Sequence, residues 1–407
     1  MRSVCARVLT GIAALVVISG VSVSPLEGQR LGPAQKRPKL AAGADTNDAL
    51  AYLTYAAREL ESAPDAAAAA FYWAARLDPS SADALYGRRI ALLMRKASTL
   101  AVVMEGKKSR SGKEFRMMDS LHLRALWLDP LLYRRFDRTM IMAYYRNVNR
   151  ADFGSAPPSE LDRAIMAYLD GASASYKAWF AYSSGRMDQA LVHYEDALKR
   201  APKSAGLRMD RGRVYAIKGQ VTPALADFTA AIALIKARED KKDEDVIFYD
   251  SKALAEHSIG LLWTQKGDLD SATAAFGRAT AEDLSYHPAH VALGVTALAR
   301  HDSVTAVSEL ALAAELAVDD PWTQFLYGGT LLVTGQHAEA VAPLKKSIEL
   351  EEFFAAPHFA LGRALERSDP AAARASYERF IALSSRRNAD RAVATERVAA
   401  LAKSGAR

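Results

Sequence analysis

Evenly spaced small residues recur through the second half of this chain. Four glycines and three alanines carry the spacing: Gly260, Gly294, Gly328 and Gly362, with Ala272, Ala306 and Ala340. The interval from each of these glycines to the next, such as that from Gly260 to Gly294, is constant. A constant interval of this size is the signature of one supersecondary unit that is stacked on copies of itself. We therefore expect a repeat array, in which each unit packs on its two neighbours.

One unit shows the pattern of small and large residues most clearly. Its key positions are Ile259, Gly260 and Trp263, followed by Ala272, Phe276 and Ala279. This order resembles the tetratricopeptide repeat (TPR) pattern L-G-x-x-Y…A-x3-F-x2-A. The resemblance implies an all-α fold, an α-solenoid in which antiparallel helix pairs stack into a right-handed superhelix. It also implies a concave groove that binds peptides and is lined by the first helix of each pair.

The small residues of the period have a packing interpretation. A glycine inside a helix costs about 1 kcal/mol relative to alanine, so four glycines in register indicate a close helix contact that offsets this cost. We predict that each glycine lies where the second helix of the pair approaches. Phe276 and its equivalents then fill the space between helices, and none of these positions is expected to carry chemistry.

The register divides the chain into segments. The interval from Gly212 to Gly260 is longer than the others, and the extra residues fall in 236–249, which includes a mixed-charge run. Residues 47–170 are expected to form diverged helix pairs, and residues 386–407 a polar capping helix and tail. The regular array is predicted at 171–385, in units 171–204, 205–238, 253–286, 287–320, 321–354 and 355–385.

The N-terminus has the features of a secretory signal. Arg2 and Arg7 precede an uncharged apolar run from Val8 to Val23, and we expect cleavage after Gly28. The alternative is an uncleaved membrane anchor. Residues 29–46 are predicted to be a flexible linker. The only cysteine is Cys5, so removal of the signal would leave a chain without thiol chemistry or disulfides.

Composition argues against nucleic acid as a partner. The formal net charge is +6 over 407 residues, and no predicted helix carries a dense stripe of Lys and Arg. The basic stretch from Glu105 to Arg116, which also contains Ser and Gly, is interpreted as a solvated insertion, with a contact patch for an anionic partner as the alternative.

Candidate binding residues follow from the resemblance. In TPR proteins, positions two, five, nine and twelve of each unit line the groove. Carried over by position, the candidates here are Trp179, Tyr182, Met209, Arg213, His257, Leu261, Val291, Val295, Trp322, Phe325, Phe359 and Arg363. Aromatic residues and arginine are the usual binding hot spots, and an exposed apolar groove would mark a partner site.

Enzymatic function has no support in the sequence. The Ser-nucleophile, dinucleotide and P-loop motifs are absent, and we expect no catalytic, cofactor or metal site. His287 and His290 are spaced as a ligand pair, but no third ligand accompanies them. The sequence therefore predicts a non-enzymatic scaffold, exported to the periplasm or beyond, that binds a protein or peptide in its groove. The alternative is a membrane-anchored envelope assembly component that contacts its partners through the N-terminal third.

Overall fold

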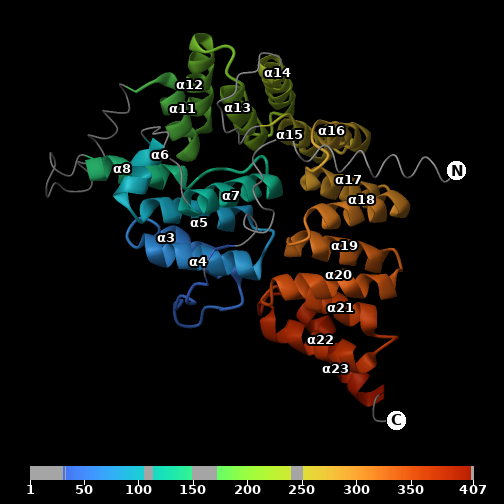
Figure 1. Ribbon diagram of the computed structural model, residues 1–407. Coiled ribbons are helices and arrows are strands. Elements are labelled where there is room, and N and C mark those ends of the chain that lie inside the picture. The colour runs from blue at the N-terminus through green and yellow to red at the C-terminus, as the bar shows by residue number, and fades with distance from the viewer. Residues whose placement is uncertain (1–30, 33, 105–112, 149–171, 240–250, 405–407) are drawn as a thin grey trace.

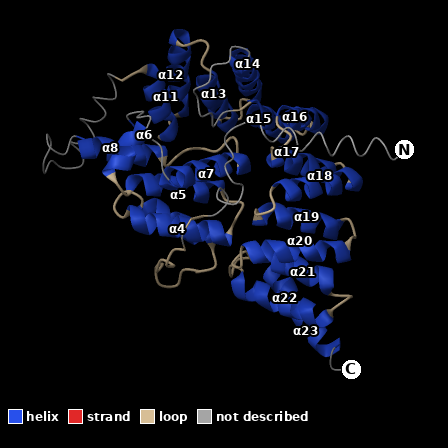
Figure 2. Cartoon of the chain, viewed as in Figure 1, coloured by secondary structure: helices blue, strands red, loops and turns tan. Residues whose placement is uncertain are grey.

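The computed structural model describes residues 31–32, 34–104, 113–148, 172–239 and 251–404, and within these ranges all regular structure is α-helical (Figures 1 and 2). The signal, its cleavage site and Cys5 lie outside the described residues, as do 105–112 of the basic stretch and 240–249 of the predicted insertion. The helices are α3 (Ala49–Glu59), α4 (Pro64–Leu77), α5 (Ala82–Met94), α6 (Ala97–Met104), α7 (Lys113–Leu128), α8 (Asp137–Val148), α11 (Ala174–Ser183), α12 (Met187–Arg200), α13 (Ala205–Ile217), α14 (Val221–Glu239), α15 (Lys252–Gln265), α16 (Leu269–Glu282), α17 (His287–Ala299), α18 (Ser303–Leu316), α19 (Pro321–Val333), α20 (His337–Leu350), α21 (Ala356–Leu365), α22 (Pro370–Leu383) and α23 (Asp390–Ser404).

Each unit of the period is a pair of antiparallel helices. From α11 onward the helices pack as α11–α12, α13–α14, α15–α16, α17–α18, α19–α20 and α21–α22, each pair on the next, with α23 closing the stack (Figure 1). The turns repeat as well: Asp268 and Asp302 cap α16 and α18 by accepting hydrogen bonds from the backbone N–H groups of Ser271 and Thr305. Such caps satisfy backbone donors that the first helical turn leaves free. The predicted α-solenoid is confirmed.

The glycines of the period lie where the two helices of a pair cross. A Cβ atom placed on Gly260 would lie 2.3 Å from Cε1 of Phe276. Gly294 and Gly328 face Leu310 and Leu344 in the same way, at 2.6 and 2.7 Å from Cγ. Real Cβ atoms do not approach so closely. The predicted packing role of these glycines is therefore confirmed.

One turn departs from the pattern. Gly267 and Gly335 adopt left-handed φ angles of 79° and 85° at the ends of α15 and α19. The equivalent residue between α17 and α18 is His301, with φ of 61°. A side chain in this conformation costs about 1–2 kcal/mol, which glycine avoids. The left-handed turn conformation therefore recurs at the same position of the repeat even though histidine replaces glycine there.

The segment before α3 is packed and does not form the predicted flexible linker. Its described residues, 31–32 and 34–46, lie against the first helix pair. Trp73 of α4 donates a hydrogen bond from Nε1 to the carbonyl of Gln35 (3.0 Å), and Arg37 donates from Nε to the Tyr52 hydroxyl (2.8 Å). The Arg37 guanidinium also lies 4.7 Å from the Trp73 ring centroid, and Leu40 joins the core of α3–α8. Sequence periodicity missed this segment because its contacts come from isolated side chains.

The helix pairs curve so far that the first pair meets the later ones. Arg76, in the last turn of α4, forms an ion pair with Glu351 in the α20–α21 turn, with 2.9 Å between Nε and Oε1. The ring of Phe353, in the same turn, packs edge-on against Trp73 at a centroid distance of 5.0 Å. In Figure 1 the N-terminal helices and α19–α22 accordingly form two arms joined by α11–α16.

We predict opposite effects for two Gly→Ala substitutions on neighbouring helices. Gly260→Ala should lower the free energy of unfolding by about 1–3 kcal/mol, because the added methyl group overlaps the Phe276 ring. Gly277→Ala, on α16, should raise it by about 0.5–1 kcal/mol, because no atom lies within 4 Å of the added Cβ and alanine favours the helix. Urea unfolding followed by circular dichroism measures both. Stabilisation by both substitutions would contradict the close contact.

Candidate functional site

The expected groove is covered at its N-terminal end by the chain itself. Three candidate groove residues of the first two regular units are buried: Tyr182, Met209 and Arg213. The segment that follows α7 covers two of them, since Tyr182 donates its hydroxyl hydrogen to the carbonyl of Leu132 (3.0 Å) and Arg213 donates from Nε to the carbonyl of Pro130 (3.0 Å). A ligand cannot reach these side chains in this structure.

An ion pair fixes this covering segment on the inner helices. Arg134 forms an ion pair with Asp210 of α13, with 2.7 Å between its NH2 nitrogen and Oδ1, and Asp210 also pairs with Arg213 (3.0 Å). Burial alone would lower the pKa of Arg134, but the carboxylates of Asp210 and Asp137 raise it well above its usual value. The guanidinium therefore stays charged, and it holds residues 130–134 where the first two regular units were expected to bind a ligand.

Four other candidate groove residues either contact structural partners elsewhere or lie on the surface away from the remaining candidates. Trp179 donates from Nε1 to Oδ2 of Asp137 at 2.6 Å, which ties α11 to α8. Phe325 and Phe359 are partly buried and pack against aromatic rings of their own helix pair or of the α20–α21 turn. Arg363 is exposed on α21. The structure does not bring these four side chains into one site.

The remaining candidates meet in a single pocket, which we call the inner pocket. It lies between α7 and the first helices α15, α17 and α19, and has a volume of about 210 Å³. Five candidates contribute to its wall: His257, Leu261, Val291, Val295 and Trp322. His257 and Val291 occupy equivalent positions of successive units, as do Leu261 and Val295, so the period places them on matching faces of α15 and α17.

The opposite wall of the inner pocket consists of residues that the sequence did not single out. Arg124, Trp127 and Leu128 come from the last turns of α7. They lie outside the regular repeat, on a helix of the diverged region far upstream of α15 in the chain. Their spacing of three and four residues places them on one helix face, but only the curvature of the solenoid brings that face to α17.

One ion pair lies in this largely apolar wall. Arg124 approaches Oδ1 of Asp320 to 3.5 Å, and Asp320 caps α19 by accepting hydrogen bonds from the N–H and hydroxyl groups of Thr323 (2.9 and 2.6 Å). Burial lowers the pKa of Arg124, and the Asp320 carboxylate opposes that change. The pocket therefore offers a buried charged pair at one edge and apolar or aromatic surface elsewhere.

Two histidines of the inner pocket are held in the neutral form. Burial, with a smaller effect from His287, lowers the pKa of His257 to about 3, and Nδ1 of His257 lies 2.9 Å from the Tyr286 hydroxyl oxygen. Burial also lowers the pKa of His287 to about 4. The ring of His287 packs edge-on against Trp127 at 5.0 Å between centroids. Both rings therefore serve as aromatic wall at neutral pH.

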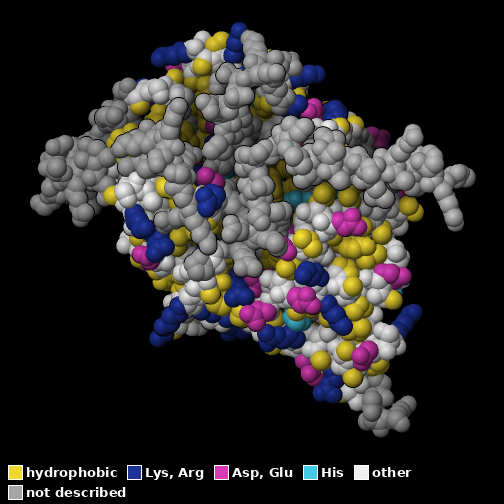
Figure 3. Space-filling view, viewed as in Figure 1, with side chains coloured by type: hydrophobic (Ala, Val, Ile, Leu, Met, Phe, Trp, Pro, Cys, Tyr) yellow, Lys and Arg dark blue, Asp and Glu magenta, His cyan; other side chains and the backbone are white. Residues whose placement is uncertain are grey.

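The side chains that the structure describes form no metal cluster. No group of three His, Cys, Asp or Glu side chains among them is arranged to hold a metal ion. His290, the neighbour of His287 in the sequence pattern, pairs with Glu309 at 2.8 Å. On the face shown in Figure 3, acidic and basic side chains are interspersed with hydrophobic ones. In addition, none of the described helices has the length and apolarity needed to span a membrane.

We predict that acid destabilises the fold through the buried histidines. In the unfolded chain a histidine has a pKa of about 6.5, whereas the pKa of His257 in the folded chain is about 3. Between these two pH values the unfolded state binds one more proton than the folded state, so the free energy of unfolding falls as the pH drops from about 6.5 to about 3. His257→Gln should reduce the slope by up to about 1.4 kcal/mol per pH unit. The matched change at exposed His337 should leave the slope unchanged. Urea midpoints measured at several pH values test this, and equal slopes in wild type and both variants would contradict it.

Neither a protein-family model nor a curated protein sequence matches this chain. Solved structures that resemble it include YrrB, described as a TPR protein with an unusual peptide-binding site, at 18% identity and a TM-score of 0.37, over 47% of this chain and 91% of YrrB. MamA from Desulfovibrio magneticus is similar at 18% identity and a TM-score of 0.35, over 44% of this chain and 92% of MamA. A tetratricopeptide repeat protein from Parabacteroides merdae is similar at 15% identity and a TM-score of 0.37, over 67% of this chain and 98% of that protein.

The identity of the fold follows from the chain's own geometry. The regular period, the antiparallel helix pairs and the glycine contacts at each helix crossing are those of the pattern that the sequence resembles. The array from α11 to α22 is an α-solenoid of antiparallel helix pairs, and its sequence pattern resembles the tetratricopeptide repeat.

Proposed function

We propose that this protein is a non-enzymatic scaffold that binds a protein partner through the inner pocket. The observation that carries the proposal is the pocket itself, since it joins aromatic and aliphatic side chains from three successive units with the buried Arg124–Asp320 pair. Aromatic residues and arginine in a desolvated pocket are typical of binding hot spots. A few fixed polar groups in an apolar cavity would orient what binds there.

The size of the inner pocket indicates how a partner would bind. Its volume of about 210 Å³ is below the range of about 300–1,000 Å³ that is typical of drug-sized ligands. Residues 130–134 already cover the inner face of α11 and α13. An extended peptide along the whole superhelix therefore does not fit this structure. We propose instead that a partner inserts one apolar or aromatic anchor side chain, with a hydrogen-bonding group beside Arg124 and Asp320.

We also propose that the chain works outside the cytoplasm. This rests on the sequence alone, namely Arg2 and Arg7 followed by the apolar run from Val8 to Val23. Mass spectrometry of the mature N-terminus in the native host tests it. A chain that begins after Gly28 supports export with cleavage, and an intact N-terminus in the membrane fraction supports the anchored alternative. An intact chain in the cytosol contradicts both.

Ala292→Phe is predicted to weaken partner binding strongly without disturbing the core. Ala292 lines the inner pocket and is only partly buried, so a phenyl ring there fills the cavity. A peptide that binds the wild-type chain is first selected from a displayed random library. Its affinity for the wild type and for each variant is then measured by fluorescence polarisation. We expect at least about tenfold weaker binding, equivalent to about 1.4 kcal/mol.

A matched substitution controls for the added aromatic surface. Ala375→Phe places the same side chain at an exposed position of α22 and should bind like wild type. Trp322→Ala, which removes part of the wall of the inner pocket, should weaken binding like Ala292→Phe. Full affinity in both pocket variants would overturn the proposed site.

A further inference from the structure

We propose that the solenoid is held closed by a latch between its first and last helix pairs, and that opening this latch gives a partner access to the inner pocket. The latch consists of Asp45, Asn47 and Arg76 on the N-terminal side and Glu351, Phe353 and Arg386 on the C-terminal side. The regulatory role rests on the function proposed above. The latch itself rests on contacts between segments that lie far apart in the chain.

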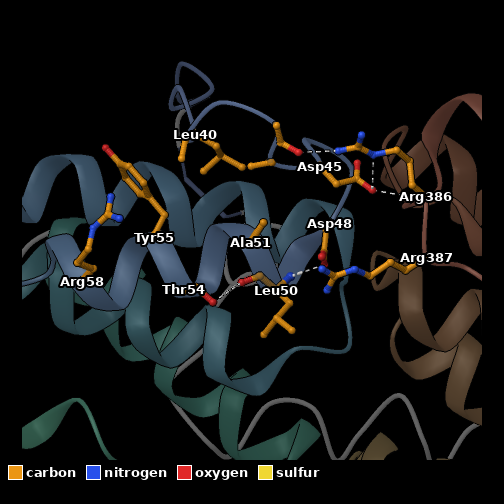
Figure 4. A pocket seen from close by; sticks show the side chains of 13 residues that line it. Leu40, Asp45, Asp48, Leu50, Ala51, Thr54, Tyr55, Arg58, Arg386 and Arg387 are labelled. Atoms are coloured by element: carbon orange, nitrogen blue, oxygen red, sulfur yellow. Dashed lines mark hydrogen bonds and ion pairs between the residues drawn. The ribbon is translucent and has the colours of Figure 1, made fainter.

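The first half of the latch joins the segment before α3 to the end of α22. Asp45 accepts a hydrogen bond from the backbone N–H of Arg386 (2.6 Å), and the Arg386 side chain donates to the carbonyl of Gly43 (2.9 Å). Asn47 donates from Nδ2 to the carbonyl of Ala382 (2.8 Å). Figure 4 shows Asp45 and Arg386 reaching toward each other from the two arms. All of these contacts are polar and at the surface.

The second half of the latch joins the end of α4 to the α20–α21 turn. Arg76 donates from Nε to both carboxylate oxygens of Glu351 (2.9 and 3.0 Å), and its guanidinium lies 4.4 Å from the Phe353 ring centroid. Phe353 packs in turn on Trp73. Arg76 and Glu351 are each less than one-fifth exposed, so this half is stronger than the first.

The latch differs in kind from the contacts that build the solenoid. Successive pairs share continuous apolar cores, and in a solenoid each unit depends only on its neighbours. Loss of the latch would therefore leave every helix pair intact. The Arg386 side chain is 65% exposed, and exposed ion pairs of this kind contribute little and are screened by salt. The contacts of Arg386 can therefore break while the fold persists, whereas the Arg76–Glu351 pair and the Phe353–Trp73 contact are largely buried and hold the closed form more firmly.

Opening would act directly on the inner pocket. One wall of the pocket is α7 on the N-terminal arm, and the other is α15–α19 on the C-terminal side. The Arg124–Asp320 pair and the Trp127–His287 ring contact span the two walls, and Leu126 of α7 is buried in the apolar core that α13–α17 share. If the arms separate, α7 stays on the α13–α17 core through Leu126, α19 moves away from α7, and the aromatic wall around Trp322 becomes accessible. The latch and the pocket are therefore linked by geometry.

The test is a distance measurement between the two arms of the full chain. Spin labels are attached to Ala57→Cys on α3 and Ala375→Cys on α22, both exposed, in a Cys5→Ser background, and double electron–electron resonance is recorded. Wild type at low salt should give one narrow, short distance. Arg76→Glu/Arg386→Glu places like charges across the latch and should give a broad distribution at longer distances. Addition of Glu351→Arg to this variant should restore part of the short population.

Salt and a remote charge reversal provide the controls. Raising NaCl from about 0.1 M to about 1 M, which shortens the Debye length from about 10 Å to about 3 Å, should lengthen the wild-type distances. Arg200→Glu, which breaks an exposed pair with Asp196 on α12, should not change them. Unchanged distances in Arg76→Glu/Arg386→Glu, or an already broad distribution in wild type at low salt, would overturn the latch.

The same variants separate the latch from the proposed function. Distances report on the latch without any partner, so peptide binding can fail while the latch holds. If both proposals hold, the peptide selected on wild type should bind Arg76→Glu/Arg386→Glu several-fold more tightly. Equal affinity in open and closed forms would overturn the regulatory role and leave the pocket itself in place.

Discussion

The contact between a glycine on one helix and a large apolar side chain on its partner sets the geometry of this protein. At Gly260, Gly294 and Gly328 there is no room for even one additional carbon atom. The two helices of a pair are thereby held at one separation, and the large side chain fills the space beside the glycine. Because the contact recurs at the same position of each unit, each pair is placed on the next in the same way, and the stack curves.

Curvature has a consequence that no single pair shows. It brings the first helix pair to the α20–α21 turn and places one face of α7 against α17 and α19. Two parts of the chain cover inner surface that an open solenoid would expose to a partner. Residues 130–134 cover α11 and α13, and α7 covers the later units. Between α7 and the first helices α15, α17 and α19 there remains a small pocket with apolar walls and one buried ion pair. Such a site favours an anchored side chain over a long extended peptide.

The electrostatics of the inner pocket follow from burial. The histidines stay neutral, because the free-energy cost of moving their charged form out of water exceeds the stabilisation of that charge by neighbouring groups. Arg124 stays beside Asp320, where each charge compensates for the other. The pocket is therefore aromatic in character with a single fixed dipole at its edge. In the latch, the Arg76–Glu351 pair is buried to a similar degree, whereas the pairs of Arg76 with Glu352 and of Arg386 with Asp45 each have one exposed partner, which makes them weaker and sensitive to salt.

The sequence by itself determined the repeat unit. Glycines, alanines and their partners at fixed spacing specify helix pairs, because helix packing is local and each position meets the same neighbours in every unit. The same register placed Leu261, Val291, Val295 and Trp322 on one face, and they line one pocket. It could not reveal that Tyr182, Met209 and Arg213 are buried, or that Arg124 and Trp127 complete the pocket. Those facts depend on contacts between segments far apart in the chain, which only the accumulated curvature of the tertiary structure brings together.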